Sequence, residues 1–207
     1  MAGHKYECKY YKRHYSDLKH DDLRLFLRLY LLLKNEKDLA SRKVNLQYDE
    51  SVEKSFNDLD KLNVEKSPLM TLVFLRILKV FKDCGIENWN HSMLLEYFSK
   101  LCHNGLIVLS KYDTVAQGIY MSPSVFGHSC APNATLSFNG YRLNIRAIKE
   151  IHKGDPITFS RTRVDADREQ RRLSLKDTHI DCKCERCTTN SDRGRITLLN
   201  PKMTFLS

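Results

Sequence analysis

The chain has 207 residues, of which 42% are hydrophobic and 29% are charged, a composition that indicates a globular protein with a sizeable core. Its longest apolar run, Leu25–Leu33, is interrupted by Arg28 and is too short to span a bilayer, so the sequence predicts no membrane segment. The first thirteen residues are polar and basic rather than a secretory signal. We therefore expect a protein of the cytoplasm, the nucleus or both, in which clustered cysteines bind metal rather than form disulfides.

The formal net charge of +9 permits contact with nucleic acid or another polyanion. The basic residues are spread along the chain and form no long tract. The favoured interpretation is therefore a solvated basic surface, and a nucleic-acid site is not indicated.

The first half of the chain shows mostly helical patterns. Residues 1–16 have no apolar periodicity and predict a polar tail, in which His4 and Cys8 stand in H-x-x-x-C spacing. Caps, apolar spacing and stop signals predict the following helices: Asp21–Lys34, with Asp21 and Asp22 near its cap; Val52–Leu62; Pro68–Asp83, capped by Ser67, ended by Gly85 and buried on most sides; and a helix capped by Ser92 and ended by Asn104-Gly105.

The hydrophobic period then changes to that of strands. Strands are expected at Leu106–Leu109, Ala134–Phe138, Tyr141–Ile148 and Pro156–Ser160. Asn139-Gly140 predicts a hairpin turn with both residues at positive φ. A charged helix is expected over Asp165–Asp177, and the tail after Cys187 offers little structure. The sequence thus predicts an α+β protein.

Residues 182–187 have the C-x-C-x-x-C spacing of a metal knuckle. A closed tetrahedral zinc site needs four ligands, and the knuckle supplies three. Cys130, in the polar turn Gly127–Asn133, is the preferred fourth ligand, although spacing does not exclude His179 or Cys102. A structural zinc ion here would join the C-terminal segment to the turn.

The segment Gly118–Asn133 resembles the core motif of SET-domain lysine methyltransferases, G-x-x-x-x-x-S-x-x-N-H-S-C-x-P-N. The stretch Phe138–Asp155 looks like the hairpin and the R-A-x-x-x-I-x-x-G-E segment that follow it in that family. The chain is most similar to the SMYD subfamily, in which a MYND zinc finger and a helical insert split the SET domain. His4 and Cys8 match the last two ligands of a MYND finger, so the chain would begin inside that finger.

The resemblance implies a SET-type β-fold of short strands with a helical insert and a C-terminal zinc knuckle. Its parts would be a MYND remnant (1–16), the helical insert (17–104), the SET core (105–164), the post-SET helix and zinc knuckle (165–187) and a tail (188–207). We further expect that the pair His4 and Cys8 alone holds no zinc, because two ligands do not make a site.

The resemblance also implies site residues and chemistry. The four zinc ligands of the family match Cys130, Cys182, Cys184 and Cys187. The positions that would contact S-adenosylmethionine are Asn104, Ser124, Gly127 and His128. The implied activity is methyl transfer to a lysine of a histone or of another protein, which would be the partner of this chain.

Three positions depart from the family pattern. Gly127 replaces an asparagine that helps to hold the cofactor, and Ile180 replaces an aromatic residue that backs it. Arg161 replaces the tyrosine that orients the methyl group, so no catalytic residue is assigned, because a permanently charged guanidinium is a poor substitute for a phenol. Two hypotheses stay open: a methyltransferase of weak activity, or a catalytically inactive, zinc-stabilised module that binds other proteins.

Overall fold

The computed structural model describes residues 4–18, 21–46, 49–110, 113–176, 178 and 180–189. The chain forms two compact units, and each is described by itself. The first comprises the described residues up to Gly105 together with Gln117–Ser122, and the second comprises Leu106–Ala116 and the described residues from Pro123 onward. Among the described residues, no helix has the length and apolar character needed to cross a membrane.

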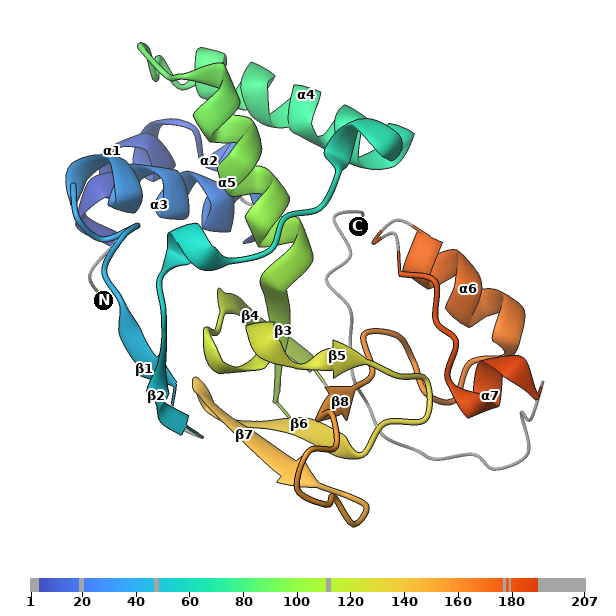
Figure 1. Cartoon of the computed structure of the whole chain (residues 1–207). Coiled ribbons are helices and arrows are strands. Elements are labelled where there is room, and N and C mark those ends of the chain that lie inside the picture. The colour runs from blue at the N-terminus through green and yellow to red at the C-terminus, as the bar shows by residue number, and fades with distance from the viewer. Residues whose placement is uncertain are drawn as a thin grey trace. The chain divides into compact units, whose positions relative to one another are not determined.

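Helices dominate the first unit, which also contains a two-stranded sheet (Figure 1). Its elements are α1 (His4–Arg13), α2 (Tyr15–Leu18), α3 (Asp21–Asn35), β1 (Val44–Leu46), β2 (Asp49–Lys54), the 3-10 turns η1 (Phe56–Asp58) and η2 (Val64–Lys66), α4 (Pro68–Asp83) and α5 (His91–Asn104). The ring centroid of Phe26 in α3 lies 5.8 Å from that of Phe81 in α4 and 5.7 Å from that of Phe98 in α5. All three rings are buried, so these helices share one aromatic core.

The N-terminal segment is a helix rather than the polar tail that the sequence predicts. α1 buries the Glu7 carboxylate, which accepts hydrogen bonds from Arg24 and Arg28 of α3 and lies 3.0 Å from Nδ1 of His4. The helix shows no apolar period because polar contacts rather than apolar ones hold it against α3. A search for hydrophobic periodicity therefore misses it.

The segment Val52–Leu62 is not the helix that its apolar spacing predicts. β2 pairs antiparallel with β1, with Val44 opposite Lys54, and η1 follows. Ser55 turns the chain into η1, because its N–H and its hydroxyl both donate to Oδ2 of Asp58, at 2.8 and 2.7 Å. The apolar side chains still reach the core by this route, and the buried ones are Phe56, Leu59 and Leu62.

The bounds of α4 agree with the sequence prediction. The Met70 N–H donates to Oγ of Ser67 at 3.3 Å, and Pro68 occupies the first turn. Gly85, with φ of +65°, follows the end of the helix in the left-handed conformation that glycine adopts without strain. The expectation of burial on most sides is wrong, however, since Leu72 is 64% exposed.

The cap of α5 differs from the prediction. Oδ1 of Asn90, rather than the Ser92 side chain, accepts the Met93 N–H at 3.0 Å. Gly105 follows the helix with φ of −64°, so the chain passes into β3 in an extended conformation. The helix begins two residues earlier than the sequence suggests, because asparagine caps a helix as well as serine does.

The remaining elements lie mainly in the second unit. They are β3 (Gly105–Ser110), β4 (Asp113–Ile119), η3 (Ser122–Val125), β5 (Gly127–His128), β6 (Ala134–Asn139), β7 (Arg142–Ala147), β8 (Thr158–Phe159), α6 (Arg168–Lys176) and α7 (Glu185–Thr188). β3 pairs with β4, β5 with β8 and β6 with β7 (Figure 1). Phe126, Leu136 and Phe159 form the buried core of these strands.

The hairpin of β6 and β7 is confirmed, but its turn is displaced by one residue. Asn139 is the last paired residue of β6 and lies opposite Arg142. The loop is therefore Gly140-Tyr141, and Gly140 has φ of +58° whereas Asn139 does not adopt a positive φ. A glycine at the first loop position suffices for a tight hairpin turn.

The helix expected over Asp165–Asp177 is shorter in the structure. α6 begins after Asp167, whose Oδ1 accepts the Gln170 N–H at 2.8 Å, and runs to Lys176, while residue 177 lies outside the described residues. The predicted strand Pro156–Ser160 is likewise reduced to the two residues of β8.

We expect Glu7→Gln to lower the free energy of unfolding by about 1–3 kcal/mol at pH 7, because a neutral amide accepts weaker hydrogen bonds from two guanidinium groups. Burial opposes ionisation of Glu7, but hydrogen bonds from Arg28, Arg24 and His4 lower its pKa from 4.5 to about 2. The stabilisation is therefore complete above pH 4.5 and disappears as the pH falls toward about 2. Urea unfolding of both proteins across this range measures the difference.

Asp83→Asn is the matched control, because Asp83 is 41% exposed and Lys79, its partner in an ion pair, is 74% exposed. This change should cost about 0–1 kcal/mol. An equal loss in the two variants, or a Glu7→Gln loss that persists unchanged at low pH, would contradict this account of α1.

Candidate functional site

A short parallel ladder holds the turn that carries the first predicted metal ligand. β5 lies beside β8, with Gly127 opposite Thr158 and His128 opposite Phe159. The Gly127 N–H donates to the carbonyl of Ile157 at 3.2 Å. The ladder continues past β5, since the Ser129 N–H donates to the carbonyl of Phe159 at 3.2 Å.

Asn133 closes the turn, a role that sequence reasoning missed. Its Oδ1 accepts the Thr158 N–H at 2.8 Å, and its Nδ2 donates to the carbonyl of Pro156 at 2.9 Å. Its own carbonyl accepts the Ile148 N–H at 2.8 Å. One side chain and one carbonyl thus join the turn to the strand segments on both sides. The Pro132-Asn133 pair of the sequence motif was the signal that could have indicated this role.

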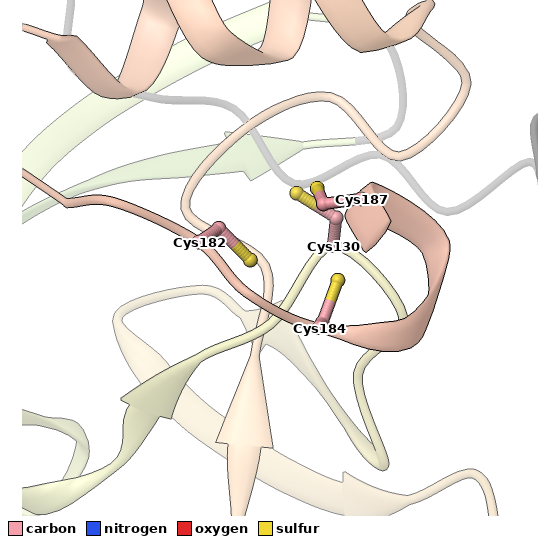
Figure 2. A group of neighbouring side chains, drawn as sticks. All are labelled: Cys130, Cys182, Cys184 and Cys187. Carbon is pink, nitrogen blue, oxygen red and sulfur yellow. The ribbon is translucent and has the colours of Figure 1, made fainter. Parts of the chain in front are cut away.

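The four predicted cysteines come together in the second unit. Their side chains point into one common space (Figure 2), and their sulfur atoms all lie within 4.8 Å of one another. Four sulfurs about 2.3 Å from a central zinc ion would lie about 3.8 Å apart, so this group fits a tetrahedral ion with little adjustment. Its members are Cys130, Cys182, Cys184 and Cys187.

Of the two alternative ligands, Cys102 is not part of this group. Cys102 belongs to α5 in the first unit, and burial raises the pKa of its thiol. His179 lies outside the described residues.

Arg186, inside the knuckle, holds the two halves of the cysteine cluster together. Its Nη1 donates to the carbonyl of Cys130 at 3.4 Å and also to the carbonyl of Val164. Its Nη2 donates to the carbonyl of Ala166 at 3.2 Å. One guanidinium therefore connects the knuckle, the turn and the segment before α6. Nothing in the spacing of the cysteines predicts this contact.

The electrostatics of the cluster favour a bound cation. Burial raises the pKa of the Cys130 thiol, and its hydrogen bond with Cys187 acts in the same direction. Burial also raises the pKa of Cys182. Burial opposes ionisation of Cys184 as well, but the Cys187 N–H and the Cys182 thiol lower its pKa to about 7. A metal ion beside the cluster would offset the effect of burial on Cys130 and Cys182 and favour their thiolates.

His128 connects the turn to the end of β8. Its Nδ1 accepts the Arg161 N–H at 3.0 Å, and its Nε2 lies 3.4 Å from Sγ of Cys130. Burial lowers the pKa of His128 to about 4, with further contributions from the charges of Arg161 and Arg171. The imidazole is therefore neutral at physiological pH.

The predicted cofactor residues are divided between the units. Ser124 in η3, together with Gly127 and His128 in β5, belongs to the second unit, whereas Asn104 ends α5 in the first. The Asn104 Nδ2 donates to the carbonyls of Asp60 and Lys100, both at 2.8 Å. Its Oδ1 is buried and has no hydrogen-bond partner among the described residues, a state that a donor on a ligand would relieve.

The three departures from the family pattern occupy distinct environments. Gly127 does not adopt a positive φ, and a Cβ there would meet only Cγ2 of Thr158, at 3.6 Å, so a side chain fits. The Arg161 guanidinium lies over the ring of Phe159, 5.0 Å from its centroid. Ile180 packs against the cysteine cluster.

A cavity of about 1060 Å³ adjoins the knuckle. α6 lines it on one side, and the knuckle, with Ile180, Cys182 and Cys187, lines it on another. Its basic lining residues are Arg168, Arg171, Arg172, Lys176 and Lys183, against the acidic Glu169 and Asp181. The lining residues of this cavity do not include the predicted cofactor positions Ser124, Gly127 and His128.

Comparison with known proteins identifies the family of this chain. The family model for the SET domain matches residues 30–160. The mouse (Mus musculus) protein named Histone-lysine N-methyltransferase SMYD3 is 29% identical over 197 residues, which cover 94% of this chain and 46% of that protein. The human (Homo sapiens) protein of the same name gives the same identity and coverage.

A second group of relatives gives a similar result over a shorter stretch. The rat (Rattus norvegicus) protein named N-lysine methyltransferase SMYD2 is 29% identical over 143 residues, which cover 68% of this chain and 33% of that protein. The chain thus spans less than half the length of these relatives. The family match covers more than half of the chain and includes the turn, the ladder and Cys130. This chain therefore belongs to the SET-domain family and is a SET protein of the SMYD type.

Proposed function

We propose that this chain carries the methyl-transfer region of a protein-lysine N-methyltransferase that uses S-adenosylmethionine and is stabilised by a structural zinc ion. The observation that carries the proposal is the joining of the motif turn to the knuckle in one unit, with four cysteine sulfurs within 4.8 Å of one another. The names of the relatives add the reaction class, since they describe lysine methyltransferases, one of them acting on histones. A lysine of a histone or of another protein of the cytoplasm or nucleus is the proposed substrate.

Zinc would be held by the four cysteines and would have a structural role. The four sulfurs would fill all four positions of a tetrahedral ion and would leave none open for water or substrate. Its binding free energy would stabilise the second unit, because the ligands come from the turn and from the distant knuckle. The ion would therefore act on the reaction only by fixing the turn.

S-adenosylmethionine would be contacted in the second unit by Ser124, Gly127 and His128. When bound, it supplies an electrophilic methyl group that is transferred from sulfur to a neutral lysine amine. A side chain fits at Gly127, where the family has an asparagine, since a Cβ there would lie in ordinary contact with Thr158 at 3.6 Å. In the first unit, the buried Oδ1 of Asn104 has no hydrogen-bond partner among the described residues and could accept from a polar ligand. The protein's task in such a transfer is mainly to orient the two reactants.

Arg161 would change the charge at the lysine-binding position. A guanidinium beside the substrate disfavours the lysine ammonium, which weakens substrate binding but also favours the neutral amine that reacts. It also disfavours the positive sulfonium of the cofactor. We therefore propose that the chain transfers methyl groups more slowly than a SET protein with tyrosine at this position.

The second candidate function is a zinc-stabilised module that binds proteins without methylating them. Arg161 favours it, because the family has a methyl-orienting tyrosine at this position. The Arg161 guanidinium instead lies over the ring of Phe159. The two candidate functions differ in whether the chain methylates a lysine substrate. Methylation of a lysine-containing protein or peptide library by the zinc-loaded chain supports the first function, and its absence in a chain that binds S-adenosylmethionine supports the second.

We expect Cys184→Ser to reduce bound zinc from one equivalent to near zero and to destabilise the second unit, because metal-binding free energy is folding free energy at such a site. Elemental analysis and thermal unfolding measure the two effects. Cys8→Ser is the matched control, since Cys8 lies in α1 outside the cluster, and it should keep full zinc. Full zinc with native stability in Cys184→Ser would refute the four-sulfur site.

Gly127→Asn should tighten binding of S-adenosylmethionine by about tenfold, because a side-chain amide can add one or two hydrogen bonds to the cofactor. Gly127→Ala is the control, since it fills the same space beside Thr158 without adding an amide. Calorimetric titration of the three proteins measures the affinities. Equal affinities throughout would show that this position does not contact the cofactor.

Arg161→Tyr should raise the rate of methyl transfer by about 10- to 100-fold, because it removes the charge and restores a group that can orient the methyl. Arg161→Phe separates the two effects, since it removes the charge without supplying a hydroxyl. Radiolabelled methyl incorporation under single-turnover conditions is the measurement. A tyrosine variant no faster than the arginine protein would speak against Arg161 as the limiting substitution.

A further inference from the structure

Two N–H donors lie against the cysteine cluster from outside it. His128 reaches Sγ of Cys130 from β5, and Arg171 reaches Sγ of Cys187 from α6. Neither belongs to the four sulfurs that face the metal position. Both side chains are nevertheless placed by other contacts, so their approach to sulfur is built into the fold.

The hydrogen bonds of His128 fix its tautomer. Because Nδ1 accepts the Arg161 N–H at 3.0 Å, that nitrogen carries no proton. In the neutral ring the proton is then on Nε2, which lies 3.4 Å from Sγ of Cys130. This nitrogen therefore donates to the sulfur, at a distance normal for an N–H···S hydrogen bond.

Arg171 is the largest of the fully buried side chains in the described part of the protein, with 0% exposure. Its Nη1 donates to the carbonyl of Ala166 at 2.7 Å, which orients the guanidinium. Its Nη2 then lies 4.0 Å from Sγ of Cys187. Burying a guanidinium is costly unless it meets negative charge, and a thiolate cluster supplies that charge.

The charge of the loaded site explains why such donors are needed. Four thiolates around one divalent zinc ion carry a net charge of −2, and two of the four sulfurs are buried. An N–H donor on the side of the sulfur away from the metal stabilises this charge and fixes the direction of the ligand. Cys130 and Cys187 are the two buried members of the cluster, and they are the ones that receive the donors.

We propose that His128 and Arg171 are positioning residues of the zinc centre, which donate N–H···S hydrogen bonds to Cys130 and Cys187 and thereby set the zinc affinity. The inference rests on the zinc site proposed above. The same imidazole also accepts a hydrogen bond from the backbone N–H of Arg161, the position at which the family has a tyrosine. The zinc centre and the end of β8 are then connected through one ring.

The test uses paired variants of the full chain. In His128→Asn the side-chain amide lies near the Nδ1 position and leaves Cys130 without its donor, whereas in His128→Gln an amide nitrogen lies near the Nε2 position and keeps it. Arg171→Met removes the guanidinium at similar length, and Arg171→Lys keeps the charge. Zinc affinity is measured by competition with a chromophoric chelator, and circular dichroism checks the fold of each loaded protein.

We expect His128→Asn and Arg171→Met each to weaken zinc binding by about 10- to 100-fold, with His128→Gln and Arg171→Lys closer to the parent chain. The cobalt-substituted proteins give a second readout. Loss of an N–H···S bond makes a thiolate a stronger donor, so the sulfur-to-cobalt charge-transfer band should move to lower energy in His128→Asn and return in His128→Gln. This readout does not respond to a general loss of stability.

Unchanged zinc affinity and an unchanged cobalt band in His128→Asn and Arg171→Met would overturn the inference while leaving the zinc site in place. A parent chain that binds neither zinc nor cobalt would overturn the zinc site, and the inference with it. If Arg171→Met does not fold, the His128 pair decides the result, since the β5–β8 ladder does not depend on that ring.

Discussion

The convergence of four cysteine sulfurs is the constraint on which the second unit depends. Cys130 leaves the β5–β8 ladder, and the knuckle comes from the segment after α6, so a metal ion between them joins parts that are distant in the sequence. Leu175 packs beside these sulfurs, and Arg186 joins the same segments through backbone carbonyls. A small unit in which the turn rests on two strands of two residues each, β5 and β8, gains from such a connection.

The same cluster reaches the proposed reaction centre through a short series of contacts. Sγ of Cys130 faces the His128 ring, the ring holds the Arg161 N–H, and the Arg161 guanidinium covers Phe159. Two of the positions at which the chain departs from the family, Gly127 and Arg161, therefore adjoin His128 in sequence or in space. Their effects on cofactor binding and on rate should be coupled rather than additive, since they act on one network.

The sequence predicted the cysteine cluster better than the fold of the first unit, for physical reasons. Cysteine spacing predicts a cluster because metal geometry admits few arrangements, and the hairpin and α4 follow from local glycine and capping signals. α1 was missed because the buried carboxylate of Glu7 holds it, and Val52–Leu62 was misassigned because strand and 3-10 turn place the same apolar residues in the core. The roles of Asn133, Arg171 and Arg186 depend on backbone carbonyls and sulfurs that only the folded chain brings near.

The central claim is that the zinc-stabilised turn still forms a methyl-donor site despite Gly127, Arg161 and Ile180. Calorimetric titration of the folded, zinc-loaded chain with S-adenosylmethionine tests it most directly, with circular dichroism as the check on folding. The account predicts saturable binding to a single site in the micromolar range. A folded chain that holds one equivalent of zinc and binds no S-adenosylmethionine would contradict it and would leave the protein-binding module as the function of this scaffold.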